Sequence, residues 1–454
     1  MPILPSAVAP ARTPTRRTLL QASAYAGISF MFRPGIARTY AANEKLRMAC
    51  VGAGGQASGG VSTALGQHLV AVAEVDQGNR GAASLKQVME KSPDTRIYSD
   101  YRRMFDEHPQ LDAVWVGCPD HNHFSASIRA LHCGAGVYCE KPLTWSIWEA
   151  RKLREVAMEK RLPTQMGNQG HSSESIRLIC EHLWAGHLGE VREAHMICNR
   201  RFTAGDSRPA SKPVPQGLDF EAWLGPAPQR DFHDGLHSFS WRGWLDFGTG
   251  SLGDMGCHNI DGACWALKLH EAASFEVEAL QGKNTRQGHA PEAVIRYSFP
   301  ARADLPPCTM TWYHGGKKAP RPAGMEEGRP LLGEGLYLVG SKGLLSSGSH
   351  CQDTQLIPKT LHASTPTPPK LLPRSKHGHG GDFIQACKAK DPLLPSSNFD
   401  YAARLTEIVL AGNLALAVGE KLTYSMKDGR TNLESANALL KRTPRAGWEA
   451  GYEG

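Results

Sequence analysis

A glycine-rich segment between two short apolar runs constrains the fold of this chain more than any other feature. The first run, residues 48–51, ends at Gly52, and a stretch of small residues follows. A second apolar run then ends at Asp76. The order strand, tight turn, helix and strand is typical of a βαβ unit, so the sequence predicts the start of a parallel sheet.

The turn after the first run fits the pattern G-x-G-x-x-A, with Gly52, Gly54 and Ala57 at its fixed positions. In a dinucleotide-binding turn the first glycine makes the sharp bend and the second leaves room for a pyrophosphate. The third small residue lets the helix pack on the strand. Backbone N–H groups at the helix start, here those of Gly55 and Gln56, would face the phosphates. The alternative is a plain glycine turn, since such turns are common.

An acidic residue ends the second apolar run. Asp76 follows Gly52 by 24 residues, which is near the usual spacing of the acid that binds the ribose 2′-hydroxyl. Such an acid would repel a 2′-phosphate, so the sequence predicts NAD rather than NADP as the cofactor. Arg80 lies close enough to weaken this preference, and NADP is therefore the second prediction.

Residues 1–42 differ in composition from the rest of the chain. They contain five arginines and neither lysine nor acid, so the formal charge of +7 falls to +2 without them. This balance does not indicate nucleic acid or an anionic membrane as a partner. Arg16 and Arg17 precede a modest apolar stretch, and Ala41 and Ala42 close the segment, as in a twin-arginine (Tat) export signal. The alternative is a disordered basic tail.

The sequence therefore predicts export by the Tat route to the periplasm or the exterior. No segment after residue 42 has 18 uncharged apolar residues, so we expect no transmembrane helix. The 11 cysteines include no Cys-x-x-Cys pair. Their odd number and scatter predict mostly buried free thiols, although an oxidising compartment permits disulfides.

Two domains are expected after the signal. In residues 43–163 strands alternate with helices, which predicts a doubly wound parallel sheet, an α/β dinucleotide-binding domain of the Rossmann type. In residues 164–454 strand-like runs cluster, which predicts an α+β domain with a large, mostly antiparallel sheet. The sharper expectations are helices at 79–91, 123–133, 147–160, 171–185, 250–269 and 399–418, and strands at 112–117, 137–139, 190–198, 273–280, 292–299, 308–314 and 334–339. Residues 199–247 are expected to be irregular, and the proline-rich residues 360–376 extended and exposed.

A polar patch, CPDHNH at residues 118–123, follows a predicted buried strand. Ligands of an open α/β sheet lie beyond the carboxyl ends of its strands, which makes Pro119, Asp120, His121 and His123 candidate cofactor-binding residues. The alternative, which is compatible with the first, is a polar turn with Asn122 as the N-cap of the next helix. The two histidines lack a third ligand at a recognisable spacing, so we predict no metal site.

A second patch, Glu140-Lys141-Pro142, follows a short predicted strand. A lysine there can reach the cofactor crevice, polarise a substrate hydroxyl and stabilise a developing alkoxide. The alternative is a surface lysine.

A third patch, GDMGCHNID, covers residues 253–261. Asp254 and His258 are four residues apart and would share one face of a helix. A histidine can accept the proton of an alcohol, and a nearby carboxylate can orient it. The alternatives are a core histidine in a capped helix start, and a metal pair that lacks the glutamate of His-Glu-x-x-His.

The order of the glycine turn, CPDHNH, EKP and GDMGCHNID resembles the Gfo/Idh/MocA family of NAD(P)-dependent sugar and inositol oxidoreductases. WLGPAPQR at 223–230 and residues 241–261 and 398–416 are similar to its exported bacterial members, of the glucose-fructose oxidoreductase and inositol dehydrogenase type. The resemblance covers about residues 45–424. It departs from the common pattern at Ala57, where many members have glycine.

The resemblance implies a role for several residues. Lys141, Asp254 and His258 would surround the substrate carbon beside the nicotinamide. Glu140 and Asn168, the latter in GNQGH at 167–171, would add cofactor contacts. The resemblance also supports the sheet-rich second domain, whose open face often forms homo-oligomers.

Three functions are compatible with these features. The first is an NAD-dependent oxidoreductase acting on a secondary alcohol of a sugar, cyclitol or derivative, with His258 as base, Lys141 as polarising cation and Asp254 as orienting carboxylate. Because free nicotinamide cofactor is scarce outside the cytoplasm, an exported enzyme would retain its NAD and recycle it. The second is an NAD-dependent redox glycosidase, which oxidises, eliminates, hydrates and re-reduces one substrate. The third is a non-catalytic sugar-binding protein.

Overall fold

The computed structural model describes residues 44–453. The predicted export signal, with Arg16 and Arg17, lies outside the described residues.

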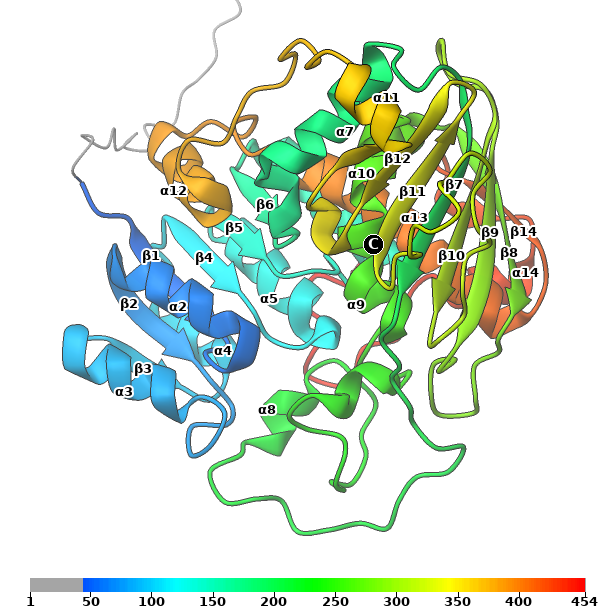
Figure 1. The fold of residues 1–454 in the computed structure, drawn as a ribbon. Coiled ribbons are helices and arrows are strands. Elements are labelled where there is room, and N and C mark those ends of the chain that lie inside the picture. The colour runs from blue at the N-terminus through cyan, green and yellow to red at the C-terminus, as the bar shows by residue number, and fades with distance from the viewer. Residues whose placement is uncertain (1–43, 454) are drawn as a thin grey trace, which may run out of the picture. The chain divides into compact units, whose positions relative to one another are not determined.

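The first part of the described chain is built on a six-stranded parallel sheet with the strand order β3-β2-β1-β4-β5-β6 (Figure 1). The chain moves outward from β1 in one direction and then in the other, which is the doubly wound arrangement that the sequence predicts. The strands are β1 (Arg47–Val51), β2 (His68–Ala73), β3 (Arg96–Tyr98), β4 (Ala113–Val116), β5 (Gly136–Cys139) and β6 (Thr164–Met166). The predicted Rossmann fold is confirmed.

Helices connect these strands. They are the 3₁₀ turn η1 (Gly55–Ala57), α2 (Ser58–Leu65), α3 (Ala82–Lys91), α4 (Tyr101–Glu107), α5 (Asp120–His132) and α6 (Ile147–Lys160). The predicted bounds of α6 match because its start is encoded locally. Ser146 accepts a hydrogen bond from the Glu149 backbone, and the Glu149 side chain accepts one from the Ser146 backbone. Helix α5 begins earlier than predicted, with Pro119 rather than Asn122 as its N-cap.

The second part contains a nine-stranded sheet with the order β13-β12-β11-β7-β10-β9-β8-β14-β15. All neighbours in it are antiparallel except β7 and β10, which confirms the predicted mostly antiparallel sheet. Its strands are β7 (Val191–Cys198), β8 (Ser274–Gln281), β9 (Ala293–Phe299), β10 (Cys308–His314), β11 (Gly335–Gly340), β12 (Gly343–Ser347), β13 (Gln355–Ile357), β14 (Leu422–Ser425) and β15 (Arg430–Thr431).

The rest of the described chain forms further helices. They are η2 (Gln169–Ser172), α7 (Glu174–Trp184), α8 (Phe220–Leu224), η3 (Ser240–Gly243), α9 (Gly250–Asn259), α10 (Asp261–Ala266), η4 (Leu269–Glu271), η5 (Ser349–Cys351), α11 (Lys359–Ser364), α12 (Gly378–Ala389), α13 (Phe399–Val418) and α14 (Glu434–Asn437). The single helix expected at 250–269 is two helices, α9 and α10, which meet at Ile260. The stretch expected to be extended at 360–376 begins inside α11.

Helix α13 joins the two parts into one core. It packs against α6 of the first part and against α9 and β8 of the second. The Asn398 side chain caps its first turn, and Gly419 ends it in the left-handed conformation. Among residues 44–453 it is the one helix with the length and apolar character to cross a membrane, and 78% of its apolar window is buried inside the protein.

The parallel sheet extends three residues past the predicted boundary at Pro163, because β6 is its last strand. Helix α12, far along the chain, returns to the first sheet, where Phe383 packs against Trp115 and Tyr138. All 11 cysteines are free thiols and nine are buried, as predicted.

Candidate active site

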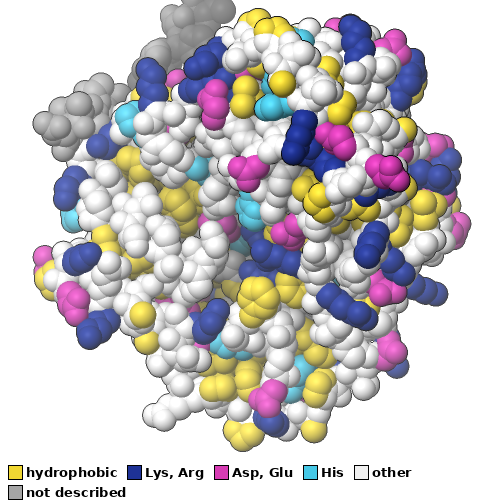
Figure 2. Space-filling view, viewed as in Figure 1, with side chains coloured by type: hydrophobic (Ala, Val, Ile, Leu, Met, Phe, Trp, Pro, Cys, Tyr) yellow, Lys and Arg dark blue, Asp and Glu magenta, His cyan; other side chains and the backbone are white. Residues whose placement is uncertain are grey.

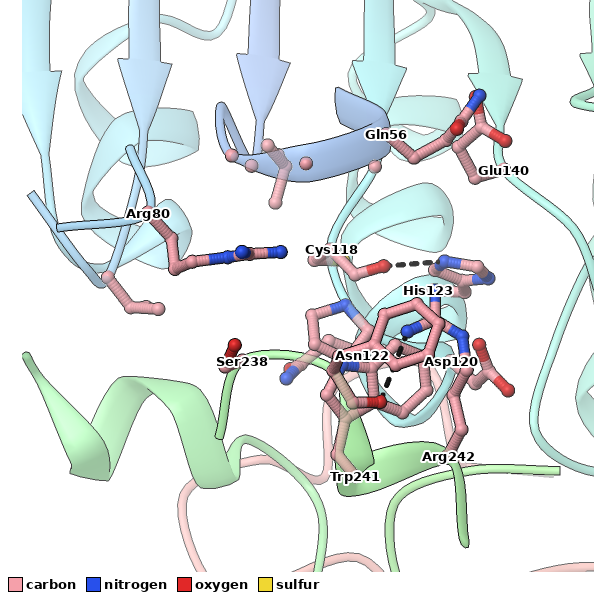
Figure 3. Close-up of a pocket in the computed structure, with 18 of the residues that line it drawn as sticks. Gln56, Arg80, Cys118, Asp120, Asn122, His123, Glu140, Ser238, Trp241 and Arg242 are labelled. Carbon is pink, nitrogen blue, oxygen red and sulfur yellow. Dashed lines mark hydrogen bonds between the residues drawn. The ribbon is translucent and has the colours of Figure 1, made fainter. Parts of the chain in front are cut away.

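A cavity of about 310 Å³ lies at the carboxyl ends of β1, β4 and β5. Its opposite wall comes from residues 237–242, α9 and the turn at His350. Basic and histidine side chains meet in a hollow near the middle of the face in Figure 2. Figure 3 shows Arg80 reaching into the cavity from one side, with Gln56 and Glu140 on the wall opposite Trp241 and Arg242. The cavity therefore occupies the crevice where open α/β sheets bind ligands.

The glycine turn forms one wall of this cavity, and its geometry explains its small residues. Gly52 has φ +92°, and an added Cβ would lie 2.9 Å from the Gly117 carbonyl carbon. A Cβ on Gly54 would lie 2.8 Å from the Arg80 carbonyl oxygen. Ala57 packs against Gly117 on the buried side of the turn, outside the cavity lining. Gly55 and Gln56 open η1 and line the cavity. These residues fit a dinucleotide pyrophosphate, which requires a close backbone approach and free N–H groups.

The acid that faces the turn is Glu74, which the sequence reasoning missed. Its carboxylate accepts hydrogen bonds from Ala53 N at 2.6 Å, Gly54 N at 3.1 Å and Asp76 N at 2.8 Å. Glu74 lines the cavity, as does Arg80. Asp76 does not; it is buried, and its carboxylate accepts a hydrogen bond from Arg80 N and lies 3.6 Å from His237 Nε2. The available sequence signal was the uninterrupted apolar run at residues 69–73, since Glu74 is the first charged residue after it.

Lys141 and Asp254 meet in the cavity although 113 residues separate them. The Lys141 Nζ donates hydrogen bonds to Asp254 Oδ1 at 2.8 Å and to the Asp254 carbonyl oxygen at 3.0 Å. Lys141 follows strand β5 of the first sheet, and Asp254 lies on α9 in the second part. The predicted surface-lysine alternative does not hold, since the Lys141 side chain is only 12% exposed.

Asp254 is the centre of an ion cluster rather than a partner of His258. Its Oδ2 accepts a hydrogen bond from Arg200 Nη1 at 2.7 Å, and its Oδ1 accepts a second one from Arg242 Nε at 3.0 Å. Burial opposes ionisation, but Lys141, Arg242 and Arg200 outweigh it and hold the pKa of Asp254 below its usual value. The expected hydrogen bond that would orient His258 is absent from the described residues, because three cations already occupy this carboxylate.

His258 lies on the same helix and lines the cavity. Its Nδ1 is buried and has no hydrogen-bond partner within residues 44–453. Its ring packs on that of His350, with the centroids 4.0 Å apart. Burial, then Lys141 and His350, lower the pKa of His258 well below 6.5. His258 is therefore a neutral imidazole that can accept a proton.

His350 is a second histidine that the sequence did not single out. It has φ +59°, and its neighbour Cys351 has φ +55°. The Asn259 side chain accepts a hydrogen bond from the His350 backbone, and Cys351 Sγ donates to the His258 carbonyl oxygen. Unusual backbone conformations of this kind are retained where the surroundings fix them, often at functional sites. No local sequence signal marks this position.

The CPDHNH patch divides between cavity and core. Pro119, Asp120 and His123 line the cavity, whereas His121 packs outside it with Nε2 2.7 Å from the Trp223 carbonyl oxygen. Thr249 Oγ1 donates to Asp120, and burial raises the pKa of Asp120 to about 6. His123 bridges the carbonyl oxygens of Cys118 and Pro142, and burial lowers its pKa to about 4.

Two further predicted residues separate in the same way. Glu140 lines the cavity, its Oε2 has no partner within the described residues, and burial raises its pKa to about 7. Asn168 is buried outside the cavity, donating to Asp261 and accepting from Ser397, while its neighbour Gln169 lines the cavity. No group of three or more His, Cys, Asp or Glu in residues 44–453 is arranged to hold a metal ion.

Two family models match the chain. Residues 46–168 match the model described as an oxidoreductase family, NAD-binding Rossmann fold. Residues 193–299 match the model of the C-terminal alpha/beta domain of the same family. The first match spans the whole parallel sheet, and the second lies within the part that contains the nine-stranded sheet.

Curated relatives match over shorter stretches. A D-xylose 1-dehydrogenase (NADP(+)) of Hypocrea jecorina is 34% identical over 95 residues, which is 21% of this chain and 24% of that protein. An inositol 2-dehydrogenase of Pseudomonas fluorescens is 30% identical over 149 residues, which is 32% of this chain and 42% of that protein. The matched stretches thus span less than half the length of these relatives.

Solved structures share the fold over most of the chain. An inositol dehydrogenase homolog from Azotobacter vinelandii, complexed with NADH and myo-inositol, has a TM-score of 0.55 at 18% identity and covers 84% of this chain and 98% of its own. An NAD-binding protein from Listeria innocua has a TM-score of 0.55 at 16% identity and covers 85% and 98%.

Proposed function

Since the chain belongs to the Gfo/Idh/MocA oxidoreductase family and carries its NAD-binding Rossmann fold, we propose that it oxidises a secondary alcohol of a sugar, a cyclitol or a derivative with NAD. The observation that carries the proposal is the meeting of Lys141 and His258 in the cavity that the glycine turn lines. The named relatives, a xylose dehydrogenase and an inositol dehydrogenase, support this substrate class.

The cofactor would be held at the glycine turn. Gly55 and Gln56 present backbone N–H groups at the start of η1, and Arg80 extends a cation toward the same space (Figure 3). We place the ribose contact on Glu74, because Glu74 lines the cavity and Asp76 does not. When bound there, NAD would supply the acceptor for the hydride of the alcohol carbon.

The chain's own residues manage the proton and the charge. Neutral His258 accepts the hydroxyl proton, since burial and Lys141 keep its imidazole uncharged before the reaction. The Lys141 ammonium stabilises the developing alkoxide. Asp254 positions Lys141 through its 2.8 Å contact. This assignment gives Asp254 a different neighbour from the one that the sequence predicts.

Glu74→Gln tests the ribose assignment. Gln keeps an oxygen that can accept from the turn but removes the charge. We therefore expect the Kd for NAD to rise about 10- to 100-fold, the worth of a charged hydrogen bond, and the preference for NAD over NADP to shrink. Titration of both cofactors measures this. Asp76→Asn is the matched control and should change the NAD affinity less than about threefold. A larger loss of NAD affinity in Asp76→Asn than in Glu74→Gln would assign the ribose contact to Asp76 instead.

A substrate panel tests the proposed activity. The purified protein with NAD is offered aldohexoses, aldopentoses, their uronates and phosphates, and inositols, and nicotinamide reduction is followed by absorbance. We expect at least one member to reduce NAD in the wild type. A panel that yields no reduction, with NAD bound, favours the non-catalytic sugar-binding protein.

The redox glycosidase is the second candidate function. The observation that favours it is the packing of His350 on His258, because elimination from a ketone needs a second group that takes a proton. An aryl glycoside distinguishes the two functions. A redox glycosidase would release the aglycone with NAD returned to its starting state, whereas a dehydrogenase would leave the glycosidic bond intact and accumulate reduced cofactor.

We also propose that the protein is exported with its cofactor, on the support of the arginine pair. Replacing Arg16 and Arg17 by lysine should leave the precursor in the cytoplasm. Cell fractionation with immunodetection measures the distribution. Replacing Arg33 and Arg38 in the same way is the control and should leave export unchanged. Export of the Arg16→Lys, Arg17→Lys variant at the wild-type level would remove the Tat assignment. Assembly as a homo-oligomer stays a prediction of the family resemblance.

A further inference from the structure

The cavity contains more positive charge than its central carboxylate balances. We call Lys141, Arg200, Arg242 and Asp254 the Asp254 cluster. Three cations contact this one carboxylate at 2.7 to 3.0 Å. A single cation would suffice to keep a carboxylate ionised and in place, and proton abstraction from a neutral alcohol needs only Lys141 beside it. Arg200 and Arg242 therefore need another explanation.

Other acids in the cavity offset this excess only in part. Glu74, Asp120 and Glu140 also line it. The Glu74 carboxylate is held by backbone N–H groups of the glycine turn, and burial raises the pKa of Asp120 to about 6 and that of Glu140 to about 7. Glu140 thus carries only part of a charge at neutral pH. The same positive charge acts on His258 and His350. After burial, Lys141 is the next influence that lowers the pKa of both His258 and His350, and Arg200 adds to it.

The two arginines also hold unused donors. The Arg200 side chain is 41% exposed and uses Nη1 for Asp254, while its Nε and Nη2 make no hydrogen bond within residues 44–453. Arg242 donates from Nε to Asp254 and from Nη1 to the Phe239 carbonyl oxygen, and its Nη2 has no hydrogen-bond partner among the described residues. Its guanidinium lies 4.5 Å from the Phe239 ring centroid and 4.2 Å from that of Trp241, so its plane is fixed before a ligand arrives.

We propose that the substrate carries an anionic group, a carboxylate or a phosphate, which Arg200 and Arg242 bind next to the carbon that is oxidised. Fixed guanidinium forks match both groups geometrically and bind them through charge-assisted hydrogen bonds. Asp254 acts as the anchor that holds both forks in the cavity. The inference rests on the proposed oxidoreductase activity for the position of the reacting carbon, but the anion site itself does not.

Inorganic phosphate is the first probe. The full chain is saturated with NAD, so that the glycine turn is filled, and its melting temperature is followed against phosphate at constant ionic strength. We expect a saturable rise in the wild type. Arg200→Gln and Arg242→Gln should each weaken the apparent Kd about 10- to 100-fold. Arg201→Gln is the matched control, since it removes the same charge one residue away and does not line the cavity.

Matched sugars identify the anion. D-glucose, D-glucuronate and D-glucose 6-phosphate are compared, with the galactose series beside them, for binding and for reduction of NAD. A preference for the uronate identifies a carboxylate, and a preference for the phosphate ester identifies a phosphate. The preference should be at least about tenfold over the neutral sugar and should disappear in Arg200→Gln.

Two results would overturn the inference. One is that phosphate does not raise the melting temperature of the wild type, or raises it equally in Arg200→Gln, Arg242→Gln and Arg201→Gln. The other is a neutral sugar that reduces NAD as efficiently as its acidic partners, in which case the oxidoreductase stands and the anionic substrate does not. If the protein binds phosphate more weakly in the Arg200 and Arg242 variants but does not bind NAD at all, the anion site stands and the proposed oxidoreductase function does not.

Discussion

Replacing His258 with alanine is expected to lower kcat by about 10²- to 10⁴-fold on any substrate that the wild type oxidises. That is the usual contribution of a positioned general base. The reason is local, since His258 lines the same cavity as Lys141 and its Nδ1 has no hydrogen-bond partner within residues 44–453. The Kd for NAD should change little, because the glycine turn and Glu74 are untouched. Steady-state kinetics and a cofactor titration measure the two quantities.

The pH profile adds a second readout of the same assignment. A base must be unprotonated to act, and burial together with Lys141 and His350 lowers the pKa of His258 well below 6.5. The acidic limb of kcat/KM should therefore lie below pH 6.5 in the wild type. Full activity of His258→Ala, with unchanged pH dependence, would remove His258 from the mechanism.

Replacing Lys141 with alanine is expected to lower kcat by about 10²- to 10³-fold, the cost of losing one donor that stabilises a developing oxyanion. Asp254 retains Arg200 and Arg242 and should remain ionised, so the loss should not come from unfolding. A thermal melt checks the fold, and the kinetics give the loss.

Lys160→Ala is the control for this experiment, since Lys160 is an exposed residue at the end of α6. It should match the wild type in both measurements. A Lys141→Ala variant that keeps kcat, or loses it only in proportion to a lost fold, would contradict the role of Lys141 in stabilising charge.

Elements whose signals are local could be predicted closely from the sequence. The bounds of α6 and α13 follow from their caps and apolar spacing. The glycine turn was recognisable from the spacing of its small residues within one βαβ unit. Their close contacts lie outside that unit, since Gly52 and Ala57 approach Gly117 and Gly54 approaches Arg80. Helix α12 was missed, since its glycine-rich first turn is a poor helix signal and packing against Trp115 and Tyr138 stabilises it.

Several contacts within the candidate site could not be predicted from the sequence. Glu74 and Asp76 are two residues apart in the sequence. Only the folded structure shows that Glu74 lines the cavity and that Asp76 does not. Asp254 and His258 do share a helix face, yet the carboxylate pairs with residues 12, 54 and 113 positions earlier in the chain. Arg200 and His350 lie 150 residues apart in the sequence and reach the same cavity through the second sheet. Such juxtapositions arise from tertiary packing, which no local pattern encodes.

The most direct measurement of the central claim is a native mass spectrum of the purified protein, taken before and after addition of NAD. We expect one NAD for each chain, either retained through purification or taken up on titration, and a loss of uptake in Glu74→Gln at limiting cofactor. A protein that neither carries nor takes up NAD or NADP would contradict the account.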